Sequence, residues 1–310
     1  MLGGDSLYGI KINGAFGVTK VHHIYAENIE CYGGSIGIFA RLDPDTSDYQ
    51  TFYPNYLMRK IIFNNFYVHD VTGEGSYIGH TSNGYWVVSP YSGLDTFVTA
   101  VRLDSVQVTN SVFLRCGWDG LQVANCKDGL VLSGNTIMDV GLQNESAQKA
   151  GILMGTNCSG DIFNNVIRRA AGNGIQVFGY GDIKVYNNIV DSCGFSDELP
   201  NGEESIYGVD YQYAYEGSSL PDQNVEIYNN YINKPQPIGA IRFYEINNRS
   251  GVMNLHDNRF CIPDALPNWQ TTNFKFPNAF LNSNNVLYCE QPCNCVITNV
   301  LKGGKYINGN

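Results

Sequence analysis

Acidic, aromatic and basic side chains recur in and beside short segments of this 310-residue chain in which apolar and polar residues alternate. Asp119 and Asp210 supply carboxylates, and a glycosidase needs two of them about 5–10 Å apart, with one kept protonated. Tyr207 and Arg242 supply a base for a polysaccharide lyase, which also needs a cation to neutralise a uronate carboxylate. These four residues are the candidate catalytic residues. We expect no protein-bound metal or other cofactor, and calcium enters only if the reaction is a lyase reaction.

Other polar and aromatic residues accompany these four and are candidates for binding the substrate. They are Gln122, Asn173, Gln176, Glu245, His80 and Trp86. Side chains alternate along a strand, so apolar residues two apart define the inward face. In segments such as 120–123 and 174–177, this alternation predicts that Gln122, Gln176, Tyr207 and Arg242 face outward.

A repeat of an apolar residue, a polar corner and a short strand positions these residues. Four copies carry an Asn-Asn pair, as in Phe163-Asn164-Asn165-Val166, and four are looser. The second asparagine of each copy is predicted at Asn28, Asn65, Asn110, Asn135, Asn165, Asn188, Asn230 and Asn258. A small residue and an alternating strand follow each copy, at 35–38, 76–79, 120–123, 151–154, 174–177, 205–208 and 240–243. Spacings of about 23–30 residues between the closest copies fit one coil of a β-solenoid.

This pattern predicts an all-β fold, a right-handed parallel β-helix of about eight or more coils with an asparagine ladder at one corner. Asparagine tolerates left-handed backbone, and its amide can bond to its copy in the next coil. Stacked coils lie about 4.8 Å apart, which places Asp119 and Asp210 about 9–10 Å apart if two coils separate them. His69 and Asp70 have the residue types of a catalytic dyad, but adjacent residues of a regular strand point to opposite faces. We therefore expect a hydrogen bond at a corner there and not a dyad.

The chain resembles the right-handed parallel β-helix superfamily of pectate lyases, polygalacturonase-type hydrolases, fructotransferases and phage tailspikes. It is most similar to secreted bacterial β-helix repeat proteins, on segments such as Gly117-Trp118-Asp119-Gly120-Leu121-Gln122 and Gly172-Asn173-Gly174-Ile175-Gln176. The resemblance covers roughly residues 8–260 and implies a carbohydrate function. The named signatures of the hydrolases (Asn-Thr-Asp, Asp-Asp, Gly-His-Gly) and of the pectate lyases (Arg-x-Pro-x-x-Arg) do not occur.

Composition excludes several classes of protein. The net charge of −10, from 19 basic and 29 acidic residues, disfavours a nucleic-acid partner because phosphates are repelled. No apolar run reaches the length of a membrane span. Abundant glycine and asparagine, with few helix-forming residues, argue against a helical bundle. We expect a monomer that binds an oligo- or polysaccharide and acts outside the cell, secreted or on a bacterial cell surface.

The repeat also predicts the domain organisation. Residues 1–262 form the β-helix, and 263–310 form an irregular C-terminal capping segment. Because residues 8–12 already have the pattern of a strand, we expect that an N-terminal part with any export signal is missing. Insertions are predicted at 43–57, 83–99, 196–204 and 214–224, and the first two are rich in aromatic residues. Cys126 and Cys158 occupy similar places in adjacent coils, as stacked core thiols or as a disulfide.

Two functional hypotheses remain open. The first is a secreted polysaccharide lyase or glycoside hydrolase that acts in a groove along one face, walled by the aromatic insertions. The second is a non-catalytic glycan-binding or adhesin-type surface protein, which the missing catalytic signatures favour. The sequence therefore indicates a carbohydrate-active protein and leaves enzymatic activity undecided.

Overall fold

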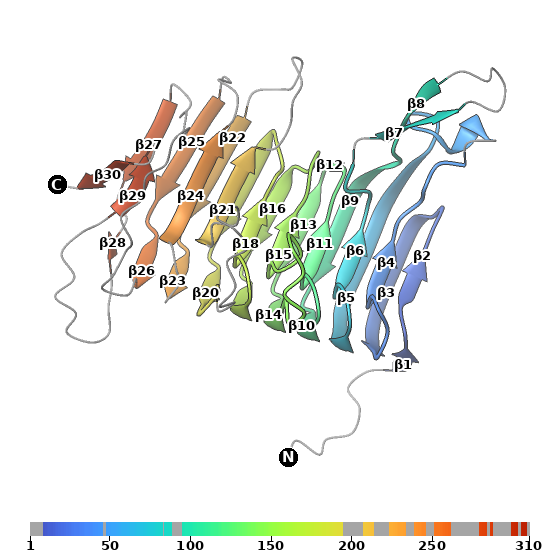
Figure 1. Cartoon of the computed structure of the whole chain (residues 1–310), viewed down its shortest axis with the longest axis horizontal. Coiled ribbons are helices and arrows are strands. Elements are labelled where there is room, and N and C mark those ends of the chain that lie inside the picture. The colour runs from blue at the N-terminus through green and yellow to red at the C-terminus, as the bar shows by residue number, and fades with distance from the viewer. Residues whose placement is uncertain are drawn as a thin grey trace.

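The chain is a parallel β-helix in a computed structural model, and Figure 1 shows its coils stacked along the long axis. The structure describes residues 9–45, 48–82, 84–88, 95–194, 207–213, 223–233, 239–245, 251–261, 279–283, 286–287, 299–302 and 305–308. The described part contains no α-helix. Each complete coil contributes one strand to each of three faces, and strands of successive coils pair in parallel.

The first and second faces belong to one sheet because the two longest strands run through both. These are β3 (His22–Tyr32) and β5 (Leu57–Val71). The first face also contains β9 (Arg102–Thr109), β12 (Cys126–Asp128), β13 (Leu130–Ser133), β16 (Gly160–Phe163), β19 (Asp182–Tyr186), β22 (Gln223–Tyr228), β25 (Gly251–His256) and β27 (Ala279–Ser283). The second face also contains β1 (Ile10–Asn13), β10 (Val112–Cys116), β14 (Thr136–Val140), β17 (Val166–Ala170), β20 (Ile189–Asp191), β23 (Tyr231–Asn233), β26 (Arg259–Cys261) and β28 (Val286–Leu287).

The third face is a separate sheet of eight strands, which agrees with the predicted number of coils. Its strands are β2 (Phe16–Val18), β4 (Ile38–Ala40), β6 (Ser76–Ile78), β11 (Leu121–Val123), β15 (Ile152–Met154), β18 (Ile175–Val177), β21 (Tyr207–Tyr213) and β24 (Gly239–Glu245). In β18, Ile175 and Val177 face inward and are fully buried, whereas Gln176 between them is half-buried. The predicted alternation is confirmed in this strand. Burial of such apolar rows from all three faces stabilises the helix.

A row of glycines precedes the third face and lets it approach the second. The row consists of Gly37, Gly75, Gly120, Gly151, Gly174 and Gly208. At Gly174 a Cβ atom would lie 2.3 Å from Cγ1 of Val190 and 2.6 Å from the carbonyl oxygen of Gly208. No side chain fits there, so the small residue after each predicted asparagine corner is a packing requirement.

The asparagine ladder lies between the first and second faces. Its members are Asn135, Asn165, Asn188, Asn230 and Asn258, all almost fully buried. The backbone N–H and the Nδ2 of Asn165 both donate to Oδ1 of Asn188, at 3.0 Å each. The same Nδ2 donates to the carbonyl oxygen of Leu132 at 2.9 Å. Each ladder amide therefore joins neighbouring coils, as predicted.

In the first coils the ladder differs from the prediction. Asn28, Asn65 and Asn110 have left-handed backbone, with φ of 60°, 53° and 53°. They occupy the place of the first residue in a later Asn-Asn pair, such as Asn164, with φ of 56°. Ser111 takes the ladder position instead, and its N–H donates to Oδ1 of Asn135 at 3.0 Å. The first three copies thus place their asparagine one residue earlier, including Asn65 of the Asn64-Asn65 pair.

The insertions and the C-terminal part add elements outside this repeat. Insertion 43–57 contains the 3₁₀ helix η1 (Tyr49–Thr51), and insertion 83–99 forms the antiparallel hairpin of β7 (Gly84–Val88) and β8 (Asp95–Thr99). Figure 1 shows this hairpin projecting beside the N-terminal coils. Parallel pairing continues past residue 262 through β27 and β28, and β29 (Asn299–Lys302) pairs with β30 (Lys305–Asn308). The predicted insertion at 196–204 lies outside the described residues, and so does the one at 214–224 except for residues 223 and 224, which begin β22.

Candidate functional site

The outward row of the third face contains four of the predicted site residues in register. Gln122 pairs with Tyr77 and Leu153, Gln176 pairs with Leu153 and Asp210, and Asp210 pairs with Arg242. The complete row is Gly17, Phe39, Tyr77, Gln122, Leu153, Gln176, Asp210 and Arg242. We call it the outer row. The sequence pattern thus aligns these residues, as the alternation requires.

The expected exposure of these residues is wrong for most of them. Asp119 and Asp210 are fully buried, and Gln122 is 1% exposed. Asn173 and His80 are also buried, and Gln176 is half-buried. Alternation determines which way a side chain points relative to the sheet, whereas corners and insertions determine whether something else covers it.

Asp119 and Asn173 hold successive coils together at the corner before the third face. Oδ1 of Asp119 accepts a hydrogen bond from the backbone N–H of Ala150 in the next coil, at 2.6 Å. Oδ1 of Asn173 accepts one from the backbone N–H of Tyr207 in its next coil, also at 2.6 Å. The two side chains do the same work, which is to pair a backbone donor that would otherwise be buried without a partner.

Asp210 lies within a small hydrogen-bonded group on the third face. Its Oδ2 accepts hydrogen bonds from Nδ2 of Asn173 at 3.1 Å and from Nε2 of Gln212 at 2.5 Å. Through Asn173 this group connects to the backbone of Tyr207. Asn173, Tyr207 and Asp210 are therefore brought together, but as a buried contact between two coils.

Asp119 and Asp210 are farther apart than expected. β11 pairs with β15, β15 with β18, and β18 with β21, so three strand steps separate the two coils. At about 4.8 Å per step the separation along the axis is about 14 Å. The strand at 151–154 belongs to a full coil, which the expected two-coil spacing omits. The two carboxylates therefore exceed the 5–10 Å of a glycosidase pair.

Tyr207 occupies the corner, not the outward position expected for it. Its carbonyl oxygen accepts a hydrogen bond from the N–H of Gly174 at 3.0 Å, and its side chain is fully buried. Gly208 takes the glycine position of this coil, so the inward residues of β21 are Val209 and Tyr211. The glycine row thus sets the register three residues away from the predicted one, which placed Ser205 at the glycine position.

Three predicted residues have a described backbone but no described side chain. Arg242 and Glu245 lie in β24, paired with Asp210 and Tyr213 of β21. Trp86 lies in β7 of the hairpin, paired with Phe97. Their roles stay predictions.

His80 belongs to a cluster of polar side chains where the two aromatic insertions begin. The guanidinium of Arg41 donates from Nη1 to the hydroxyl of Tyr77 at 2.9 Å, and its Cζ lies 5.2 Å from the ring centroid of Tyr77. Arg41 also donates to Oδ1 of Asp43, from Nε at 2.8 Å and from Nη2 at 2.7 Å. Nη2 of Arg41 and Oδ1 of Asp43 lie 3.2 and 3.3 Å from Nε2 of His80. We call Arg41, Asp43, Tyr77 and His80 the Arg41 cluster.

Both ring nitrogens of His80 are engaged. The backbone N–H of Ser82 donates to Nδ1 at 3.2 Å, so the proton of a neutral ring lies on Nε2, facing Asp43. Burial, together with the positive charge of Arg41, lowers the pKa of His80 against the opposing effect of Asp43. His80 is therefore neutral near pH 7, and its lone pair is occupied. It positions Asp43 and Arg41 and is not available as a base.

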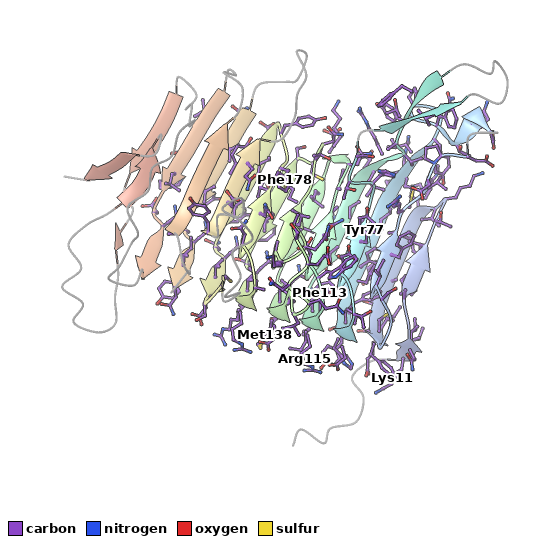
Figure 2. All side chains as sticks on the ribbon, in the orientation of Figure 1. Lys11, Tyr77, Phe113, Arg115, Met138 and Phe178 are labelled. Atoms are coloured by element: carbon purple, nitrogen blue, oxygen red, sulfur yellow. The ribbon has the colours of Figure 1, made fainter. Side chains whose placement is uncertain are left out.

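The sequence predicts His80 but not its partners. Tyr77 is the outward residue of the segment at 76–79 and could have been found from the same alternation that singles out Gln122. Arg41 and Asp43 lie at the junction of a strand with an insertion, where no repeat sets the register. Figure 2 labels Tyr77 on the third face, away from Arg115 and Met138 along the lower edge of the view.

Two further histidines bridge coils outside this cluster. Nδ1 of His69 lies 2.6 Å from Oδ2 of Asp70, the expected corner contact, and its Nε2 lies 3.3 Å from Glu30 of the preceding coil. His256 repeats this arrangement with Asp257 and Glu226, at 2.7 and 3.2 Å. Asp70 has a φ of 55°, which turns its carboxylate toward the neighbouring ring. Each histidine stacks on a tyrosine of the preceding coil, at 5.6 and 4.9 Å, so both belong to the coil-to-coil contacts.

Other site chemistry is limited in the described part of the chain. It holds no group of three or more His, Cys, Asp or Glu residues suited to a metal ion. Cys126 and Cys158 are buried free thiols in adjacent coils, so the stacked-thiol interpretation is confirmed over the disulfide. Burial raises the pKa of Cys158 to about 12, which leaves it protonated and unreactive. No described helix is long and apolar enough to cross a membrane.

Comparisons with known proteins add one structural likeness. No family model and no curated protein matches the chain. Among solved structures it is similar to the full-length tailspike protein 2 of an Escherichia coli O157:H7 bacteriophage, with 13% identity and a TM-score of 0.44. The match covers 93% of this chain and 39% of the tailspike chain. The assignment of a parallel β-helix rests on the strand pairing of the chain itself.

Proposed function

We propose that the chain is a secreted or cell-surface carbohydrate-active protein that binds an oligo- or polysaccharide on the third face. The Arg41 cluster is the observation that carries this proposal. It places hydroxyl, guanidinium and carboxylate groups on the N-terminal part of the outer row, where insertions 43–57 and 83–99 both begin. Insertions on one side of a solenoid commonly form its binding surface.

Sugar recognition needs an aromatic surface beside a few fixed polar groups. Phe39 and Tyr77 supply the aromatic part, with ring centroids 6.2 Å apart in an edge-to-face arrangement, and both are half-buried. The hydroxyl of Tyr77 also lies 3.2 Å from Oγ1 of Thr81. Arg41 and Thr81 thus hold this hydroxyl in place, which lowers the entropy that a bound glycan has to offset.

A binding protein without catalysis fits the described residues best. The carboxylates proposed for hydrolysis are buried, spaced by about 14 Å along the axis and used between coils. A lyase is the second candidate, favoured by one contact. As a phenolate beside Arg41, the Tyr77 oxygen could take the proton next to a uronate carboxylate while the bond to the leaving oxygen breaks. Any calcium would then come with the substrate.

A glycan array of bacterial and plant polysaccharides tests the proposal on the full chain. Tyr77→Phe should weaken binding of the best ligand at least tenfold, about 1.4 kcal/mol, because it removes the fixed hydroxyl. Tyr25→Phe is the matched control, since the exposed Tyr25 hydroxyl donates to Glu27 at 2.5 Å on the first face. Equal affinity of both variants and wild type, or no binding at all, contradicts the proposal. Unsaturated products from the bound glycan would instead support the lyase.

A further inference from the structure

The outer row carries no charged side chain from β4 through β18. Its five residues there are Phe39, Tyr77, Gln122, Leu153 and Gln176. Gln122 and Leu153 are buried, so the half-buried Phe39, Tyr77 and Gln176 form the surface of this part of the row. The outer surfaces of the first and second faces differ, because ion pairs cross their coils. Lys11 contacts Glu30 at 2.8 Å, Arg168 contacts Asp191 at 3.9 Å, and Lys184 contacts Glu226 at 3.9 Å. Charge is therefore distributed unevenly around the helix.

Arg41 does not restore a positive charge to this end of the outer row. Two of its nitrogens donate to one carboxylate oxygen of Asp43, at 2.8 and 2.7 Å, and a third donates to the neutral Tyr77. A glycan carboxylate would have to displace Asp43, a partner two residues away in the same chain. The side chain of Asp43 is 58% exposed, and the whole chain has a net charge of −10, so both repel a polyanion.

We infer that the glycan bound on the third face is an uncharged, hydroxyl-rich polysaccharide and not a polyuronate or a sulfated polymer. This inference rests on the proposed binding function and specifies its ligand class. Phe39 and Tyr77 offer aromatic surface to the sugar rings, and Tyr77, Thr81 and the amide of Gln176 offer hydrogen bonds to neutral hydroxyls. A neutral ligand also excludes β-elimination, which needs a uronate carbonyl group.

The test uses an array on which each acidic polysaccharide is printed twice, in native form and after reduction of its carboxylates to primary alcohols. Neutral polymers and reduced forms should bind at least tenfold more tightly than native acidic forms. Their binding should also change less than twofold between 50 and 500 mM salt, because no net charge is engaged. Stronger binding of native acidic forms overturns the inference and leaves the proposed function standing. An array without any bound glycan overturns both.

A charge variant makes the test specific to the Arg41 cluster. Asp43→Asn frees the charge of Arg41, so the ratio of native acidic to reduced binding should rise at least fivefold and become sensitive to salt. Asp182→Asn makes the same charge change on the first face, where Asp182 accepts a hydrogen bond from Asn224, and should leave the ratio unchanged. An equal rise in both variants means that the net charge of the chain, not Asp43, excludes acidic glycans. No rise in either variant overturns the role of Asp43.

Discussion

The corner side chains and the Arg41 cluster use the same residue types for different purposes. At the corners, Asp119 and Asn173 accept hydrogen bonds from backbone groups of the next coil and are buried. In the cluster, Asp43 is bonded to the side chain of Arg41 and remains exposed. In a solenoid, a polar side chain paired with the backbone of a neighbouring coil belongs to the fold. One that is paired with other surface side chains is a better candidate for a site.

The strongest way to test this comparison is to remove a corner residue. Asn188→Leu removes the acceptor of the Asn165 backbone N–H and one of the two acceptors of the Asn165 Nδ2. It also leaves the carbonyl of Ile162 without its 2.9 Å donor. Because each buried group without a partner costs about 1–3 kcal/mol, unfolding should become easier by about 2–5 kcal/mol. Urea denaturation measures this change.

The control for this variant is an asparagine outside the ladder. Asn224 is exposed on the first face, and its Nδ2 donates to Oδ1 of Asp182 at 2.8 Å. Asn224→Leu should change the free energy of unfolding by no more than about 0.5 kcal/mol. A similar loss for both asparagines would mean that the ladder has no special part in stability.

Much of the fold follows from the sequence because the solenoid repeats a few local requirements. In the three later Asn-Asn pairs, the first residue has left-handed backbone and the second lies in the ladder, as Asn164 and Asn165 do. The glycine that follows fits a corner with no room for a Cβ. These requirements are local, so spacing alone predicts the coils. The slip at Tyr207 arises because the predicted insertion at 196–204 separates its segment from Asn188, the asparagine that precedes it.

The site is less predictable because exposure depends on contacts between coils. Alternation correctly places Gln122 and Gln176 in one row, yet one is buried and the other half-buried. Asp119 lies at a corner, where its carboxylate bonds forward along the helix axis to Ala150. No pattern within a coil reveals that contact. Arg41 enters the site only through the fold, which brings it beside Tyr77, 36 residues away in sequence.

The second prediction separates the structural role of Asp119 from a catalytic one. Asp119→Ala removes the acceptor of the Ala150 N–H and should lower stability by about 1–3 kcal/mol. Asp119→Asn keeps an acceptor oxygen, as Asn173 does in its own coil, and should stay within about 0.5 kcal/mol of wild type. Thermal unfolding and glycan binding are measured together. If Asp119→Asn keeps normal stability but loses glycan binding, this carboxylate takes part in the site. The distinction between corner residues and site residues would then be wrong.

The smallest effect expected concerns two histidines whose pKa values shift in opposite directions. Burial and Arg41 lower the pKa of His80 below 6.5, so the unfolded chain takes up a proton first and stability falls as the pH drops below that value. For His256, partial burial is outweighed by hydrogen bonds to Asp257 and Glu226, which raise the pKa. The contribution of His256 to stability is complete below pH 6.5 and is lost as the pH rises through the raised pKa.

Glutamine variants of the two histidines test how stability depends on pH, through the melting temperature measured from pH 5 to pH 9. His80→Gln should reduce the loss of stability on acidification from pH 7.5 to pH 5, because the buried ring no longer has to be protonated beside Arg41. His256→Gln should instead lower stability most in acid, where the charged ring bridges Glu226 and Asp257, and the difference should disappear toward pH 9. The two slopes have opposite signs because His80 lies beside a cation, whereas His256 joins carboxylates of two coils. Parallel profiles for the two variants would mean that the cluster and the coil contacts do not differ in their electrostatics.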